Sequence, residues 1–276
     1  NATANAGDIT ITSSSTAPLT LSSVSGNVVA ISSTSTGADL NLGGAVNGAT
    51  SVALTTAANG DIYRTSVAGV ITAPSVTLTS GGNVGTLANR ILTDANTLTV
   101  IANTAGANAF ISEVDAVTLG ATSSANATFD LVAGGNLTLD NLSGTIVKLA
   151  TTNGGNIIRN AGSVSATSLT LTSDSGNIGA SPAGTNGIFT NAGTIAASTT
   201  GDIYINDTNA GTVNVGVLSG SIVALNTALN MALQQNVIGT ASVSLTAGGA
   251  GNITQLAGRT ITTPNLALAS TTGNFG

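Results

Sequence analysis

The chain has 276 residues, of which 6% are charged and 2% aromatic, and it contains no Cys, His or Trp. Its five basic residues against eleven acidic ones give no positive surface for nucleic acid. The lack of Cys and His argues against zinc, haem and iron–sulfur centres and against His-dependent catalytic triads.

Short alternating segments run along the whole chain. Each carries large apolar residues at positions i and i+2 with a small residue, most often Thr or Ser, between them, which is the period of a β-strand. They are ITIT from Ile9, LTLS from Leu19, VALT from Val52, VTLT from Val76, LTLD from Leu137, LTLT from Leu169 and VSLT from Val243. The pattern predicts that Ile157 and Leu171 point into a core and that Thr170 points outward.

A triplet of Gly, then Asn or Asp, then an apolar residue separates many of these segments. It begins at Gly7, Gly26, Gly60, Gly82, Gly135, Gly155, Gly176, Gly201, Gly251 and Gly273. Many successive triplets lie 19 to 25 residues apart, so a unit of about 20 residues recurs. We predict that Gly sits where the backbone turns a corner and that the Asn or Asp after it bonds its own backbone in an Asx-turn.

The short units are grouped into a longer sequence repeat. Similar sequences begin at Gly60, Gly155 and Gly251, which are 95 and 96 residues apart. We expect each copy to contain about five short turns. The copies are approximately 1–86 (partial), 87–180 and 181–276, and both ends fall inside the pattern. This predicts a single continuous segment over 1–276 that was excised from a longer repetitive chain.

These repeats predict an all-β fold, a parallel β-helix (β-solenoid). Its coils contain about 20 residues within a super-repeat of about 96 residues. Val, Ile, Leu and Ala are expected inside, and Thr, Ser and Asn outside. Low charge suits this stacking, because like charges on neighbouring strands repel one another. There is no run of eighteen apolar residues, so no membrane span is predicted.

The segments GDITI, GNLTLD, SVTLTSGGNVGT and SLTLTSDSGNIGA resemble the shaft repeats of filamentous-haemagglutinin-type exoproteins of two-partner secretion. The resemblance covers essentially the whole chain and implies a right-handed parallel β-helix and a secreted protein of the bacterial cell surface. The Asn-Pro-containing signatures of that family's N-terminal secretion module are not present, so the secretion route is inferred.

Acidic residues are the first place to look for chemistry. Glu113 and Asp115 are expected on one strand face, and Asp202 and Asp207 bracket the segment IYIN. We interpret them as solvated or corner-capping carboxylates, with a weak calcium site and catalysis as alternatives. No Arg or Lys lies close to either pair in sequence.

Other motifs have structural interpretations as well. Arg64 and Arg159 occupy matching positions of the long repeat and are not expected to converge. GGNVG and GGAGN lack the Lys-Ser/Thr of a phosphate-binding loop and are predicted to be corner turns. Tyr63 and Tyr204 are interpreted as exposed aromatics without function, with stacking on a sugar as the alternative. The segment TALNMALQQNVIGT from Thr227 is predicted to be a deviating loop rather than a partner-binding helix.

The pattern favours a structural shaft segment of an extracellular bacterial surface fibre or adhesin that mediates attachment or filament formation. An ice-binding β-solenoid is an alternative because of the pairs Thr10/Thr12, Thr77/Thr79 and Thr170/Thr172, and a polysaccharide-active β-helix enzyme is a second. We predict no enzyme activity, no catalytic residue, no cofactor, no metal and no nucleic-acid partner. The expected partners are further copies, joined head to tail, and a receptor outside this segment.

Overall fold

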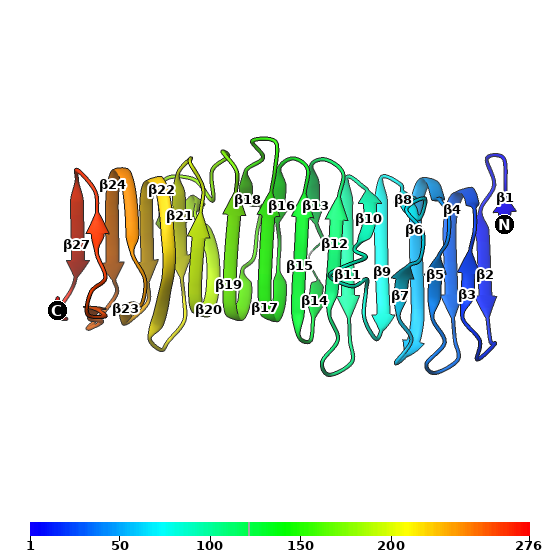
Figure 1. The fold of residues 1–276 in the computed structure, drawn as a ribbon, viewed down its shortest axis with the longest axis horizontal. Helices are drawn as coiled ribbons and strands as arrows, with labels where there is room; N and C mark the ends of the chain where they lie inside the picture. The colour runs from blue at the N-terminus through cyan, green and yellow to red at the C-terminus, as the bar shows by residue number, and fades with distance from the viewer. Residues whose placement is uncertain (121) are drawn as a thin grey trace. The chain divides into compact units, whose positions relative to one another are not determined.

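The computed structural model describes residues 1–120 and 122–276, in which almost all regular structure is β-strand. The strands pair in parallel with strands one coil further along the chain. The result is a β-solenoid of about 12 coils with a spacing of ~22 residues. The predicted fold class is therefore confirmed, and Figure 1 shows the strands of each part following one another coil by coil.

The chain divides into two compact units. Unit 1 comprises Asn1–Gly134 and Ser143–Thr145, and unit 2 comprises Gly135–Leu142 and Ile146–Gly276. Unit 1 contains β1 (Ala2–Thr3), β2 (Ile9–Ser13), β3 (Leu19–Leu21), β4 (Val24–Ser33), β5 (Leu40–Leu42), β6 (Val46–Ala58), β7 (Ile62–Arg64), β8 (Val70–Thr72), β9 (Ser75–Gly81), β10 (Ile91–Asp94), β11 (Thr97–Ala102), β12 (Ala109–Glu113), β13 (Val117–Leu119), β14 (Ser123–Ala125) and β15 (Thr128–Ala133).

Unit 2 contains the remaining elements, with most of β17. They are β16 (Leu137–Leu139), β17 (Leu142–Thr151), β18 (Ile157–Arg159), β19 (Val164–Ser173), α1 (Ala183–Asn186), β20 (Ile188–Ser198), β21 (Ile203–Asp207), β22 (Val213–Thr227), β23 (Met231–Leu233), β24 (Val237–Ala247), β25 (Ile253–Gln255), β26 (Ile261–Thr262) and β27 (Leu266–Ser270). No helix among the described residues is long and apolar enough to cross a membrane.

Three columns of inward side chains form the core of unit 1. In each column, every residue pairs with its counterpart in the next coil. The columns are Leu19, Leu40, Ile62, Val84, Ala109 and Phe129; Ile9, Val29, Val52, Val76, Leu98 and Leu119; and Ala2, Val24, Val46, Ile71, Thr93 and Glu113. Burying one Val, Leu or Ile side chain contributes about 1.5–3 kcal/mol, so the apolar columns are the main stabilising feature of the fold.

The long repeat does not correspond to a whole number of coils. In unit 2, one column runs through Ile157, Ile178, Ile203, Val223, Val243 and Leu266. The residue that matches Ile157 one long repeat later is Ile253, which pairs instead with Met231 and Phe275. From Ile157 to Ile253, one repeat therefore spans four coils and part of a fifth, rather than about five, and the two matching residues lie on different sides of the coil.

The Asn or Asp of the triplets forms a ladder of side-chain hydrogen bonds. In unit 2, Asn136 Oδ1 accepts from the backbone N–H of Asn156 at 2.8 Å, and Asn156 Oδ1 accepts from that of Asn177 at 2.6 Å. The ladder continues from Asn177 Oδ1 to the N–H of Asp202 and from Asp202 Oδ1 to the N–H of Ile222. The predicted Asx-turns are therefore wrong for these residues, because each side-chain oxygen accepts from an N–H of the next coil, 20 to 25 residues along the chain.

Buried hydroxyl groups support the same corners. Thr151 Oγ1 and Ser173 Oγ, from neighbouring coils, both donate to the carbonyl oxygen of Gly155, at 2.6 and 2.9 Å. Thr56 and Ser80 donate in the same way to the carbonyl of Gly60 in unit 1. These buried hydroxyl groups therefore donate to a carbonyl oxygen of the turn, and that of Gly60 also accepts from the backbone N–H of Gly82 in the next coil at 2.8 Å.

A substitution at Asn156 tests this ladder. Asn156→Ala removes the acceptor for the Asn177 N–H, and we expect it to lower the free energy of unfolding by about 1 kcal/mol. Asn156→Asp keeps a side-chain oxygen at this position and is expected to lose less. Urea denaturation followed by circular dichroism measures both, and equal losses would show that the acceptor does not stabilise the coil.

Two local features differ from the sequence predictions. The segment 227–240 was expected to be a deviating loop, but it continues the coil with β23, in which Met231 and Leu233 are buried. The prediction is wrong because the alternation of Met231 and Leu233 is itself a strand pattern. The helical turn lies instead at α1, where the chain leaves the solenoid for one turn after Pro182.

Candidate functional site

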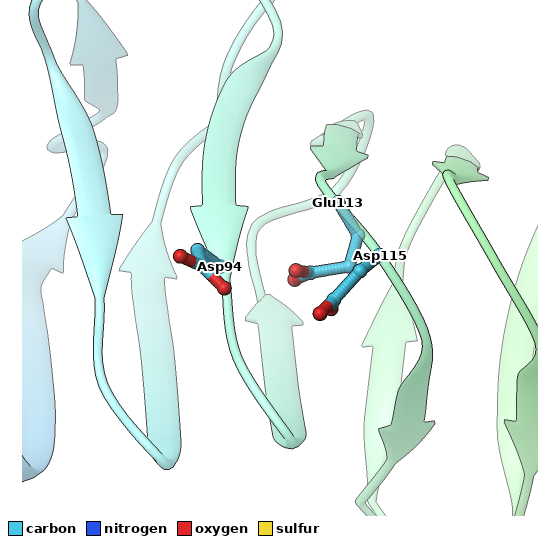
Figure 2. A group of neighbouring side chains, drawn as sticks. All are labelled: Asp94, Glu113 and Asp115. Atoms are coloured by element: carbon cyan, nitrogen blue, oxygen red, sulfur yellow. The ribbon is translucent and has the colours of Figure 1, made fainter.

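Three carboxylates meet at one corner of unit 1. Asp94 is the last residue of β10, Glu113 is the last residue of β12, and Asp115 follows two residues later. One oxygen from each group lies within 4.8 Å of the others, and Figure 2 shows the side chains turned toward one another. Carboxylate oxygens are ligands that Ca²⁺ accepts. Among the described residues, it is the only group of three or more potential metal ligands.

Glu113 is the buried member of the group. It is 2% exposed and occupies an inward position in the column that contains Val46 and Ile71. The expectation that Glu113 and Asp115 share one strand face is wrong, because β12 ends at Glu113 and Asp115 turns to solvent. A signal for the burial was present in the sequence, since Glu113 stands two residues after the buried Ile111.

Hydrogen bonds within the protein satisfy the Glu113 carboxylate. Thr93 Oγ1 donates to Oε2 at 2.6 Å, and the backbone N–H groups of Ala95 and Val114 donate to Oε1 at 3.0 and 3.1 Å. Burial raises the pKa of Glu113 above its usual value, although these bonds favour the ionised form, and the charge of Asp115 raises it further. The carboxylate therefore acts as a cap on the corner of the coil.

Unit 2 contains the same arrangement at Asp207, the last residue of β21. Thr190 Oγ1 donates to Asp207 Oδ2 at 2.5 Å, and the N–H of Ala192 donates to the same oxygen at 2.9 Å. Asp207 is 2% exposed, and burial raises its pKa. Asp202, at the other end of IYIN, belongs to the triplet ladder instead. The recurrence of a capped, buried carboxylate in both units is consistent with the corner-capping interpretation.

The raised pKa of Glu113 predicts an unusual pH dependence. As the pH falls from neutrality through the raised pKa toward the ordinary value of 4.5, the folded state binds a proton before the unfolded state does. In that interval, Glu113 makes the protein more stable at lower pH. Glu113→Gln has no proton to bind, so we expect its stability relative to the parent protein to be highest near pH 7 and to fall toward pH 4.5.

Thermal unfolding of both proteins between pH 4.5 and 7.5 measures this difference. Comparing the two proteins at each pH cancels the titration of groups that do not interact with Glu113, including that of Asp174, whose pKa is lowered by hydrogen bonds from backbone N–H groups. Parallel curves for parent and variant would contradict the prediction.

Arginines and tyrosines of the repeats have local partners. Arg159 donates to the carbonyl oxygens of Thr185 and Gly187, and its guanidinium lies 3.9 Å from the ring centroid of Phe189. Arg64 and Arg159 lie in different units.

Tyr63 donates to Asp61 Oδ2 at 2.6 Å, and burial with this bond raises its pKa to about 12.

Tyr204 repeats this geometry with Asp202 at 3.4 Å, and burial also raises its pKa. Both tyrosines are partly buried, so the expectation of exposed rings is wrong. The Tyr–Asp hydrogen bonds tie each ring to the triplet ladder.

Sequence reasoning missed an ion pair in unit 1. Arg90 Nη2 lies 2.9 Å from Asp130 Oδ1, and Arg90 Nη1 also donates to the carbonyl oxygens of Ile111 and Asp130. The guanidinium carbon is 6.0 Å from the ring centroid of Phe110. Because 40 residues separate the two charges, no local pattern in the sequence predicts the pair.

The Gly-rich segments are corner turns, as predicted. In GGNVG, Gly85 has φ of +70°, and in GGAGN the N–H of Gly251 donates to the carbonyl of Gly248. A Cβ on Gly81 would meet the backbone of the preceding coil at Ala57, so close stacking requires glycine there.

The Thr pairs lie on outward strand positions but do not form uniform columns. Thr10 is followed along its column by Ala30 and Ala53, and Thr170 pairs with Ala196. Ile101 lies beside Thr79. A flat array of Thr-x-Thr is therefore interrupted after the first pair.

No family model, no curated protein and no solved structure matches this chain. Membership of the filamentous-haemagglutinin-type family stays a prediction from the repeat sequences. The absence of a metal, a cofactor and enzyme activity likewise stays a prediction.

Proposed function

We propose that this chain is a structural shaft segment of an extracellular bacterial surface fibre or adhesin, and that it mediates attachment or filament formation. The observation that carries the proposal is the coil-to-coil bonding within each unit. Parallel backbone pairing, apolar columns and the Asn/Asp ladder all connect a coil to its neighbours. Such repeated nearest-neighbour bonding is typical of stacked-repeat architectures, in which each repeat stabilises the next.

The polar groups described above are used within the coils. Glu113 and Asp207 cap corners, Arg90 pairs with Asp130, and Tyr63 is bonded to Asp61. These side chains are satisfied by the protein itself, which supports a mechanical role better than a chemical one. The proposal includes a location on the bacterial cell surface, head-to-tail joining of copies and a receptor outside residues 1–276.

Immunogold electron microscopy tests this proposal. Antibodies raised against residues 1–276 should label fibres that project from intact, unpermeabilised cells of the source organism. Label found only inside permeabilised cells would overturn the surface location. A thermal-hysteresis assay on the purified protein separates the ice-binding alternative, and an assay on polygalacturonate with calcium separates the enzyme alternative. A positive result in either assay would replace the shaft function.

A further inference from the structure

We propose that Asn153 is a site of spontaneous covalent modification, at which the backbone nitrogen of Gly154 displaces the side-chain amide and Asp174 acts as the general base. The reaction converts Asn153 to a cyclic imide, which water then opens to aspartate or isoaspartate. Its substrate is the protein itself, so the proposal does not depend on the shaft function.

The site is an Asn-Gly dipeptide in the turn between β17 and β18. Glycine after asparagine favours imide formation, because it has no side chain to obstruct ring closure. The chain contains four such dipeptides, which begin at Asn47, Asn59, Asn153 and Asn186. All four asparagines are exposed, but Gly154 is the one glycine of the four that is exposed, and the other three are buried. The Asn153 site is therefore the one with room on both sides of the reacting bond.

The backbone holds the other three glycines in place. The N–H of Gly60 donates to the carbonyl oxygen of Ala57 at 3.0 Å, and that of Gly187 donates to the carbonyl oxygen of Ala183 at 3.1 Å. Gly48 lies inside β6, which pairs with β4 on one side and β8 on the other. Ring closure at these sites would break a main-chain turn or a strand pairing, so we expect them to react slowly.

An exposed carboxylate, rather than a carbonyl group, accepts the N–H of Gly154. Asp174 directly follows β19 in the next coil, and its Oδ1 lies 2.9 Å from the Gly154 nitrogen. A general base must lie within hydrogen-bond reach of the proton that it removes, and this distance meets that condition. The hydrogen bond from Gly154 lowers the pKa of Asp174, so this carboxyl group is ionised at neutral pH and can accept a proton.

The turn also leaves space for the rearrangement. Asn153 and Gly154 have φ of +54° and +75°, in the left-handed region that asparagine and glycine adopt more readily than other residues. A Cβ on Gly154 would meet nothing closer than Ser175 Oγ at 3.5 Å. Movement of this peptide group toward the Asn153 side chain therefore displaces no packed side chain.

The reaction balances without a cofactor. The Gly154 nitrogen forms a bond to Asn153 Cγ and gives its proton to Asp174. The Cγ–Nδ2 bond breaks, and Nδ2 takes that proton and leaves as ammonia. Water then adds to one of the two imide carbonyl groups and reopens the ring. The imide has no N–H, so the hydrogen bond between Gly154 and Asp174 is lost until the ring opens.

Incubation of the purified protein in mildly alkaline buffer tests the choice of site. Peptide mapping by mass spectrometry, with fragmentation that separates aspartate from isoaspartate, measures conversion at each of the four asparagines. We expect Asn153 to react at least about tenfold faster than the other three in the folded protein. In denaturing urea, the four rates should converge, because each site is the same dipeptide. Equal rates at all four sites in the folded protein, or conversion of Asn153 in urea alone, would overturn the proposal.

Asp174→Asn tests the general base, because the amide keeps an oxygen at the same position but is a far weaker base. We expect this variant to convert Asn153 about tenfold more slowly in the folded state and at the parent rate in urea. Asp115→Asn is the matched control, since it removes an exposed carboxylate in unit 1 and should leave the rate at Asn153 unchanged.

The measured quantity is the ratio of the rate at Asn153 to the rates at the other three sites in the same sample. Unfolding of a variant would accelerate the other three sites and is therefore visible in this ratio. A folded Asp174→Asn variant that converts Asn153 at the parent rate or faster would show that Asp174 is not the base.

Discussion

Leu171→Asp is expected to unfold the coils around β19. Leu171 is 0% exposed and pairs with Ala197 in an inward column, and the predicted inward positions of Leu171 and Ile157 are confirmed. A carboxylate at this position has no partner, and burying it costs several kcal/mol even after relaxation. We expect a loss of strand signal in circular dichroism and a new protease-sensitive site near residue 171.

Thr170→Asp is the matched control one residue away. Thr170 points outward and is only half-buried, so the added charge should change stability by less than about 1 kcal/mol. A register shift of one residue would exchange the two faces of the strand and reverse the result. Equal destabilisation by the two substitutions would mean that both faces of β19 are buried, and the single-walled coil would have to be abandoned.

Arg90→Met has the second-largest expected effect. It leaves the carboxylate of Asp130 without its ionic partner. Breaking a fully buried pair from one side costs about 3–5 kcal/mol, and we expect a loss near the lower end of that range because the Arg90 and Asp130 side chains are 21% and 10% exposed. The carbonyl groups of Ile111 and Asp130 also lose their donor. Urea denaturation should show a lower midpoint for this variant.

The double variant Arg90→Met/Asp130→Asn distinguishes a lost charge from a lost side chain. Removing both charges should recover a large part of the stability, because no unpaired charge remains in the coil. Lys148→Ala is the control for loss of an exposed cation and should stay within about 0.5 kcal/mol of the parent protein. A double variant no more stable than Arg90→Met would indicate that packing of the Arg90 side chain, rather than ion pairing, is what matters.

Much of the fold could be predicted because its determinants are local. Alternation of apolar and small residues identifies strands such as β9 and β19, and the Gly-Asx triplets mark corners. The same alternation predicts an inward side chain at Glu113, but acidic residues usually face solvent, and this general expectation led to the wrong interpretation. Contacts between coils were harder to predict. Thr93, which holds Glu113, lies 20 residues away, and Asp130 lies 40 residues from Arg90.

The direction of the triplet ladder also had to be observed. An Asn after Gly is commonly assigned to an Asx-turn with its own backbone. In this protein, Asn156 bonds to Asn177 in the next coil, at a separation of 21 residues. Only the coil length and the strand register together determine which N–H faces the side chain.

Because matching residues of two long repeats lie in different columns, a change in the number of repeats also changes the direction in which residues face. Because Ile157 and Ile253 occupy matching repeat positions but different columns, a copy adds part of a revolution as well as four whole coils. Duplication or loss of one copy in a gene would therefore turn every group carried beyond it to a new azimuth. A lineage that changes its copy number changes the direction in which distal residues face, while each coil keeps the same bonds to its neighbours.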